Sequence, residues 1–117
     1  MGKPHQRLDA WKKAIGFVKK VYEITGGFPA EEKFGLVSQM RRAAISIPSN
    51  ISEGAGRNNP KEFSQFLGIA QGSVAELETQ LIISRELNFL QNQTADGMLI
   101  ELDGISKMII GLKKSIK

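Results

Sequence analysis

The chain has 117 residues, of which 41% are apolar and 24% are charged, and its formal net charge is +4. This length and balance predict a single globular domain, residues 1–117, whose core needs no disulfide or metal to hold it. Because the sequence has no cysteine, no secretory leader and no run of about 18 apolar residues, we expect a cytoplasmic protein without membrane association.

The first apolar pattern has helical spacing, and the pair Gly26-Gly27 followed by Pro29 predicts where this helix ends. One stripe consists of Leu8, Trp11, Ile15, Val18 and Tyr22. A second stripe, which consists of Ala10, Ala14, Phe17, Val21 and Ile24, widens the apolar arc to roughly 200°. One bundle core uses only part of such an arc. We therefore expect Ala14, Phe17, Val21 and Ile24 to form a contact between subunits; a wide face buried within one chain is the alternative.

The second predicted helix begins near Glu31 and Glu32, since acidic residues suit the positive end of a helix dipole. Its apolar positions are Leu36, Val37, Met40, Ala43, Ala44 and Ile47. Pro48 cannot donate a hydrogen bond to the carbonyl of Ala44 and crowds it. We expect a kink at Pro48 and one further turn before Gly54.

Asn59, Pro60 and Glu62 together form a capped helix start. No helix-breaking residue follows until Asn92, so the third helix should run for about 30 residues. Thr94 is the predicted cap of a fourth helix. The apolar positions of that helix are Met98, Leu102, Ile105, Ile109, Leu112 and Ile116.

Four long amphipathic helices with short connections, and no hairpin signal, predict an all-α fold. The expected architecture is an antiparallel up-down-up-down four-helix bundle. In this topology the N-terminus, the connection between the second and third helices, and the C-terminus share one end of the bundle.

Residue types that support catalysis or metal binding are scarce. The only histidine is His5, and the absence of cysteine removes the other common nucleophile. The carboxylates of Glu76, Glu78, Glu101 and Asp103 have no histidine at the spacing of di-iron bundles. Gly54 and Gly56 lack the further residues of a dinucleotide or phosphate loop. We therefore expect no enzyme activity, no cofactor and no metal.

Basic residues gather at the predicted shared end, which should attract a polyanion such as RNA. They are Lys3, Arg7, Arg57, Lys61, Lys113, Lys114 and Lys117. Arg57 and Lys61 also flank a helix start, where free amides favour a phosphate. No aromatic residues alternate with these charges, so contact with the nucleic-acid backbone is favoured over base stacking. An ordinary solvated surface is the alternative.

The run from Leu36 to Gly54, LVSQMRRAAISIPSNISEG, resembles the signature of the bacterial four-helix-bundle family named for intervening sequences in 23S ribosomal RNA genes. The segment around Phe28-Pro29, with Glu32, and the segment from Phe63 to Gln80 are also similar to that family. The resemblance implies a five-fold ring with no established enzymatic activity. A distantly similar group, the accessory proteins of diversity-generating retroelements, is associated with nucleic acid and a reverse transcriptase.

Four positions match the polar residues of the family motif: Arg41, Arg42, Asn50 and Glu53. The resemblance leaves open whether they serve folding, assembly or a ligand. For Arg42 we expect an ion pair, with Glu53 or a neighbouring subunit as its partner.

These features predict a non-enzymatic homo-oligomer, a pentamer by resemblance, that binds structured RNA or a nucleoprotein through Arg7, Arg57, Lys61, Lys113 and Lys114. A protein-interaction scaffold without nucleic-acid affinity is the alternative function.

Overall fold

The computed structural model describes residues 3–116, apart from the side chains of Gln6 and Arg7. It contains four long helices, α1 (Asp9–Thr25), α2 (Leu36–Gly56), α3 (Pro60–Glu86) and α4 (Asn92–Ser115). Two short 3₁₀ helices, η1 (Pro4–Arg7) and η2 (Ala30–Glu32), precede α1 and α2. The described residues form no β-strand, so the predicted all-α fold with four helices is confirmed.

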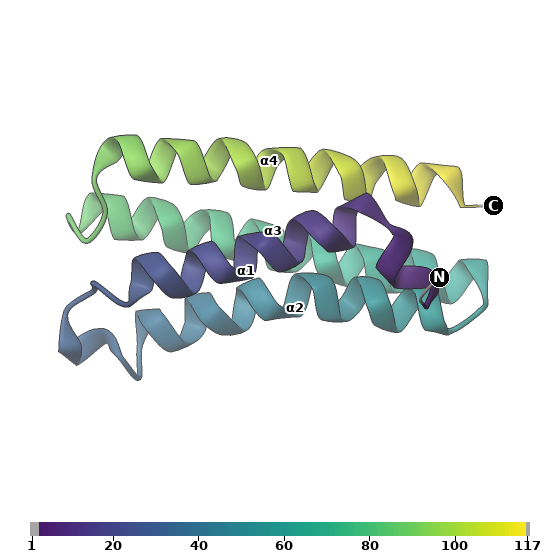
Figure 1. Ribbon diagram of the computed structural model, residues 1–117, viewed down its shortest axis with the longest axis horizontal. Coiled ribbons are helices and arrows are strands. Elements are labelled where there is room, and N and C mark those ends of the chain that lie inside the picture. The colour runs from purple at the N-terminus through teal and green to yellow at the C-terminus, as the bar shows by residue number, and fades with distance from the viewer. Residues whose placement is uncertain (1–2, 117) are drawn as a thin grey trace.

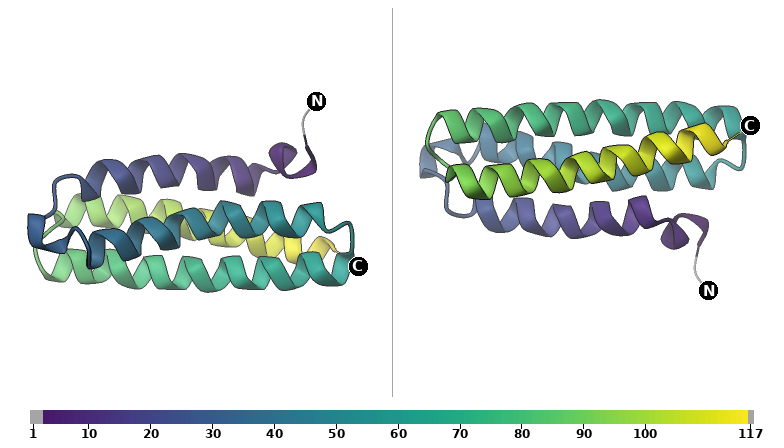
Figure 2. Two further views of the ribbon diagram at one scale, coloured as in Figure 1. Left: turned by 90° about the horizontal axis from the view of Figure 1, so that it is seen from below. Right: turned by 90° about the horizontal axis from the view of Figure 1, so that it is seen from above.

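The four helices lie side by side along the long axis of the molecule, which measures 43 × 25 × 23 Å, and successive helices run in opposite directions (Figures 1 and 2). The N-terminal segment, the α2–α3 junction and the C-terminal end of α4 lie together at one end (Figure 1). The α1–α2 and α3–α4 connections lie at the other end. The shared end expected from the sequence is therefore present.

The predicted start of α3 is confirmed, since the Asn59 side chain accepts a hydrogen bond from the backbone N–H of Glu62 at 3.0 Å. Two other predicted starts are wrong. Glu31 and Glu32 form the separate helix η2, and α2 begins only at Leu36. Thr94 lies inside the first turn of α4, because that helix already begins at Asn92.

Helix α2 continues through Pro48, as expected, but it ends at Gly56 and not before Gly54. Two residues beyond the proline, the Asn50 amide donates to the Ser46 carbonyl at 2.7 Å and to the Ser46 hydroxyl at 2.9 Å. The Ser46 hydroxyl in turn lies 2.8 Å from that of Ser73 on α3. The motif residue Asn50 thus serves the fold, because it joins α2 to α3 next to the interruption in the helical ladder.

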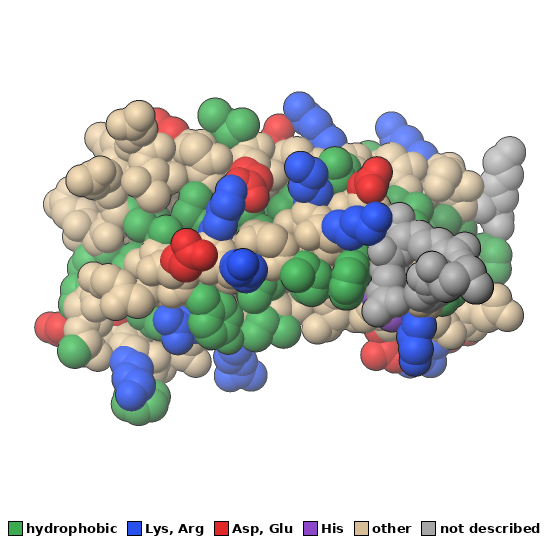
Figure 3. Space-filling view, in the orientation of Figure 1, with side chains coloured by type: hydrophobic (Ala, Val, Ile, Leu, Met, Phe, Trp, Pro, Cys, Tyr) green, Lys and Arg blue, Asp and Glu red, His purple; other side chains and the backbone are tan. Residues whose placement is uncertain are grey.

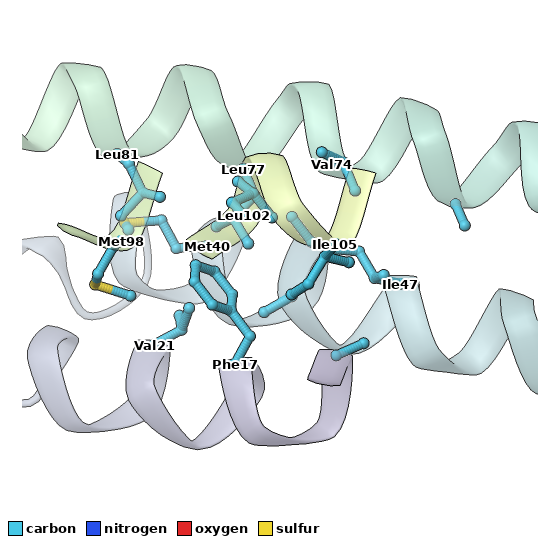
Figure 4. Close-up of a cluster of buried hydrophobic side chains, with 14 of the residues drawn as sticks. Phe17, Val21, Met40, Ile47, Val74, Leu77, Leu81, Met98, Leu102 and Ile105 are labelled. Carbon is cyan, nitrogen blue, oxygen red and sulfur yellow. The ribbon is translucent and has the colours of Figure 1, made fainter. Parts of the chain in front are cut away.

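All four helices contribute side chains to one core, and Figure 4 shows its central part. The members labelled there are Phe17, Val21, Met40, Ile47, Val74, Leu77, Leu81, Met98, Leu102 and Ile105. The apolar positions predicted for α4 from Met98 to Ile109 are buried, which confirms that face of the helix.

The predicted subunit contact on α1 is wrong. Ala14, Phe17 and Val21 are at most 1% exposed within one chain, and Ile24 packs against the same core. Ala14, Phe17 and Val21 therefore have no surface to offer a neighbouring subunit, and Ile24 is only partly exposed. The other stripe is the more exposed one, with Ile15 at 40% and Tyr22 at 41%. Because both stripes are apolar and repeat with the same spacing, the helical pattern did not distinguish the inner face from the outer one.

Helices α2 and α3 lie close together at Gly54, near their junction, and the absence of a side chain there makes this possible. A Cβ atom at Gly54 would lie 2.8 Å from Cβ of Phe66 and 2.9 Å from Cδ1 of Phe63. Both distances are shorter than carbon atoms tolerate, so any side chain here would push the helices apart. Glycine at the end of the family motif is thus explained by packing.

Candidate nucleic-acid interface

The basic end of the bundle is defined here as the surface around Lys3, Arg57, Lys61, Lys113 and Lys114. Its described residues come from the N-terminal segment, the α2–α3 junction and the last turn of α4 (Figure 1). Arg7 belongs to the same predicted set, but its side chain lies outside the described part of the structure, as does Lys117.

Arg57 is already engaged by neighbouring side chains. Its Nη2 lies 3.0 Å from a carboxylate oxygen of Glu53, and its Nη1 lies 3.5 Å from one of Glu62. The guanidinium carbon also stacks 5.0 Å from the centre of the Phe66 ring. Two carboxylates therefore offset the charge that the sequence suggested was free for a phosphate.

The predicted pair of Arg42 with Glu53 does not form, because eleven positions of one helix separate the two residues by about 16 Å, and Glu53 binds Arg57. Arg42 is exposed and makes no ion pair or hydrogen bond with the described residues. The four-residue separation of Glu53 and Arg57 on one helix is the signal that could have identified this pair from the sequence.

Lys61 is exposed in the first turn of α3, beside a hollow of about 580 Å³ whose lining includes Asn59, Ser64 and Gln65. The chain enters this turn through Asn58, which adopts a left-handed conformation with φ of 58°. Asparagine accepts this conformation more readily than most residues. The turn leaves Lys61 without a carboxylate partner among the described residues.

Lys113 and Lys114 lie in the last turn of α4, where positive charge complements the helix dipole. Lys113 is half-buried, and its ammonium donates to the Gln71 side chain at 3.5 Å, whereas Lys114 is exposed. Both charges therefore stabilise the end of α4, and Lys113 also contacts α3 through Gln71.

The two ends of the bundle differ in charge. The basic end carries five described cations, and Glu53 and Glu62 are the carboxylates of the α2–α3 junction. The opposite end is richer in carboxylates, which include Glu31, Glu32, Glu86 and Asp96. The long face shown in Figure 3 has cationic and anionic side chains interspersed, so this face is not uniformly basic.

The last motif residue, Arg41, lies far from the basic end and ties α2 to the end of α1. It donates to the Thr25 hydroxyl at 3.0 Å and to the Tyr22 carbonyl at 3.3 Å. Its guanidinium carbon stacks 4.3 Å from the centre of the Tyr22 ring.

Within residues 3–116, no group of three or more histidine, aspartate or glutamate side chains is placed to hold a metal ion. None of the described helices is both long enough and apolar enough to cross a membrane.

Residues 6–111 match the family model described as 23S rRNA-intervening sequence protein. A crystal structure of a protein of unknown function from the S23 ribosomal protein family of Bacteroides thetaiotaomicron VPI-5482 has the same fold. Its TM-score is 0.83 at 22% sequence identity, over 90% of this chain and 95% of that one. No curated protein matches this chain. Because the family model covers most of the sequence, the chain belongs to the 23S rRNA-intervening sequence protein family.

Proposed function

We propose that this protein is a non-enzymatic, ring-forming bundle of the cytoplasm that binds structured RNA, or a nucleoprotein that contains it, through its basic end. The observation that carries the proposal is the convergence of cations from three separate segments on one end of the molecule. Lysines that contact phosphates release counterions from the nucleic acid, and this release drives binding without reading the base sequence.

Three lysines carry most of this proposal. Among the described residues, Lys61 and Lys114 are exposed without a carboxylate partner, and the hydrogen bond of the Lys113 ammonium goes to a neutral amide. Arg57 contributes less, because Glu53 and Glu62 offset its charge. Point charges on flexible side chains suit a backbone contact, which favours recognition of RNA by shape and charge.

The test is a titration with a base-paired RNA hairpin at 50 and 200 mM salt. Binding through phosphates should weaken steeply between the two salt concentrations. Absence of binding at the lower concentration would contradict the RNA proposal. The alternative function, a protein-interaction scaffold without nucleic-acid affinity, would then replace it.

The pairing of Arg57 is the observation that favours this alternative. A guanidinium held by two carboxylates and an aromatic ring has a structural explanation that requires no ligand. A scaffold would use the apolar surface of the bundle instead of its basic end.

The ring proposal rests on the family resemblance and on two apolar stripes that remain exposed. A closed ring of identical subunits joins two different faces of the chain. The first stripe lies along α1 and α2 and includes Ile15, Tyr22 and Ile45, each about 40% exposed; Figure 3 shows hydrophobic side chains over these helices. The second lies on α3, where Ile69 and Ile83 are 52% and 41% exposed.

The charges beside these two stripes are opposite in sign. Lys19 follows Ile15 by one helical turn, and Arg42 precedes Ile45 by one turn. On α3, Glu76 lies midway between Ile69 and Ile83 and on the same side of the helix. A contact between the two stripes would therefore pair cations with a carboxylate, and rotation about one axis would place every basic end on the same side of the ring.

Replacing Ile15 by glutamate should dissociate the oligomer while each chain stays helical, because the new carboxylate would be buried against apolar surface in the contact. The measurement is sedimentation velocity together with circular dichroism. Ile100→Glu is the matched control, since Ile100 is 74% exposed on α4, away from both stripes. An unchanged sedimentation coefficient for I15E, or equal dissociation by I100E, would contradict this contact.

A further inference from the structure

A hollow of about 320 Å³ lies at the α1–α2 connection, at the end of the bundle opposite the basic end. The residues that matter in its lining are Thr25, Phe28, Lys33, Val37 and Arg41. Its volume is at the lower end of the range of small-molecule sites.

Neighbouring groups fix the guanidinium of Arg41 before any ligand arrives. Its Nε donates to the Thr25 hydroxyl, and its Nη2 donates to the Tyr22 carbonyl. Thr25 is itself held, since it is 3% exposed and donates to the Val21 carbonyl at 2.7 Å. Nη1 of Arg41 has no hydrogen-bond partner among the described residues. The side chain thus keeps an unused pair of N–H donors in a fixed position.

The hollow combines two cations with an apolar floor. Lys33 lines the hollow and provides the second positive charge, with its ammonium 5.4 Å from the centre of the exposed Phe34 ring. No carboxylate occurs among the described residues that line the hollow. Phe28 and Val37, 8% and 6% exposed, form the floor, and the Phe28 ring packs 5.5 Å from that of Phe89. Glu31 and Glu32 belong to the same connection but not to the lining. The charge of the two cations is therefore not offset within the hollow.

We propose that this hollow binds the C-terminal residue of a partner peptide when that residue has an apolar side chain. A guanidinium with free N–H groups recognises a carboxylate directionally, and the ammonium of Lys33 adds charge. The apolar floor holds the side chain next to the carboxylate. A hydrated phosphate group would leave this floor unused. The proposal concerns the end opposite the RNA-binding surface and does not depend on the proposed function.

The first experiment is calorimetric titration of the full chain with a pentapeptide that ends in leucine, as the free acid and as the C-terminal amide. The acid should bind at least tenfold more tightly than the amide. Equal affinity of the two would overturn the proposal. A peptide acid that ends in glycine should bind more weakly than the leucine peptide, and equal affinity of these two would overturn the role of the floor.

Two small probes distinguish a peptide terminus from other anions. 4-Methylpentanoate carries the same carboxylate and apolar group without the peptide, and inorganic phosphate carries charge alone. Both should bind more weakly than the leucine peptide. If 4-methylpentanoate binds as tightly, the ligand is a free acid and the peptide assignment is wrong; if phosphate does, the hollow is a general anion site.

Substitutions locate the site. Arg41→Lys keeps the charge but loses the planar donor group, so affinity for the leucine peptide should fall at least tenfold while helicity is unchanged. Lys33→Gln should weaken binding several-fold, with the exposed Lys13→Gln as the matched control. Parental affinity in both R41K and K33Q would overturn the proposal, and K33Q alone decides if R41K does not fold. RNA affinity should be unchanged in K33Q.

Discussion

Replacing Phe17 by alanine is expected to lower the free energy of unfolding by about 3–5 kcal/mol, the usual cost of removing a buried phenylalanine. Phe17 is 1% exposed, and its ring points into the cluster of core side chains from the other helices (Figure 4). Removing the ring leaves a cavity that rigid neighbouring helices fill only in part. Urea unfolding followed by circular dichroism measures the loss.

The control for Phe17 is an apolar residue on the surface. Ile100→Ala removes a side chain that is 74% exposed, so its effect should stay below about 0.5 kcal/mol. Both variants should be compared at one protein concentration, because oligomerisation adds to apparent stability. A change of less than about 0.5 kcal/mol in F17A would contradict the core position of Phe17.

The helices could be predicted from the sequence because their ends carry local signals. The Asn59 cap and the Gly26-Gly27 pair lie at the ends observed for α3 and α1. The start of α2 was missed because Glu31 and Glu32 suit the first turn of a 3₁₀ helix as well as that of an α-helix. Acidic or capping residues therefore locate the start of an α-helix only when the residues that follow them continue the apolar spacing of that helix.

The inner face of α1 could not be chosen from periodicity, but residue size contained a signal. Ala10 and Ala14 are small residues of the kind that allow another helix to approach closely. Trp11 and Tyr22 each carry a polar atom that is more easily accommodated near solvent. Weighing size and polarity along with hydrophobicity would have assigned the Phe17 stripe to the core.

The basic end was predictable because it depends only on the order and direction of the helices. The hollow beside Arg41 could not be predicted, because Arg41 and Thr25 are 16 positions apart and come together only when α1 and α2 pack. The sequence analysis also predicted that Arg57 would be available to a phosphate, although Glu53, its ion-pair partner, lies one helical turn before it. The spacing of residues along the sequence thus identifies ion pairs within one helix. A site between two helices can be identified only when it is known how those helices pack.

Removing the positive charges of Lys61, Lys113 and Lys114 together, by substitution with alanine, should weaken the binding of an RNA hairpin uniformly across hairpin sequences. Each lost phosphate contact lowers the slope of log affinity against log salt by about one, so the slope should fall by about three. Helicity should be retained, because the three side chains lie at the surface or at half-buried positions near the ends of α3 and α4. Fluorescence anisotropy at several salt concentrations measures both quantities.

A matched triple variant separates a defined interface from general attraction by net charge. Lys19, Lys33 and Lys107 are exposed and lie outside the basic end, so their replacement by alanine removes the same formal charge from other surfaces, including the charge of Lys107 that pairs with Asp103 at 3.2 Å. If net charge alone attracts RNA, the two triple variants should lose affinity and salt slope equally. If the basic end is the interface, the control triple should keep nearly the parental slope, because long-range attraction contributes to encounter without adding phosphate contacts. Parental affinity and slope in the Lys61, Lys113 and Lys114 variant would mean that these lysines serve only the helix ends, and the scaffold function would then account for the molecule better.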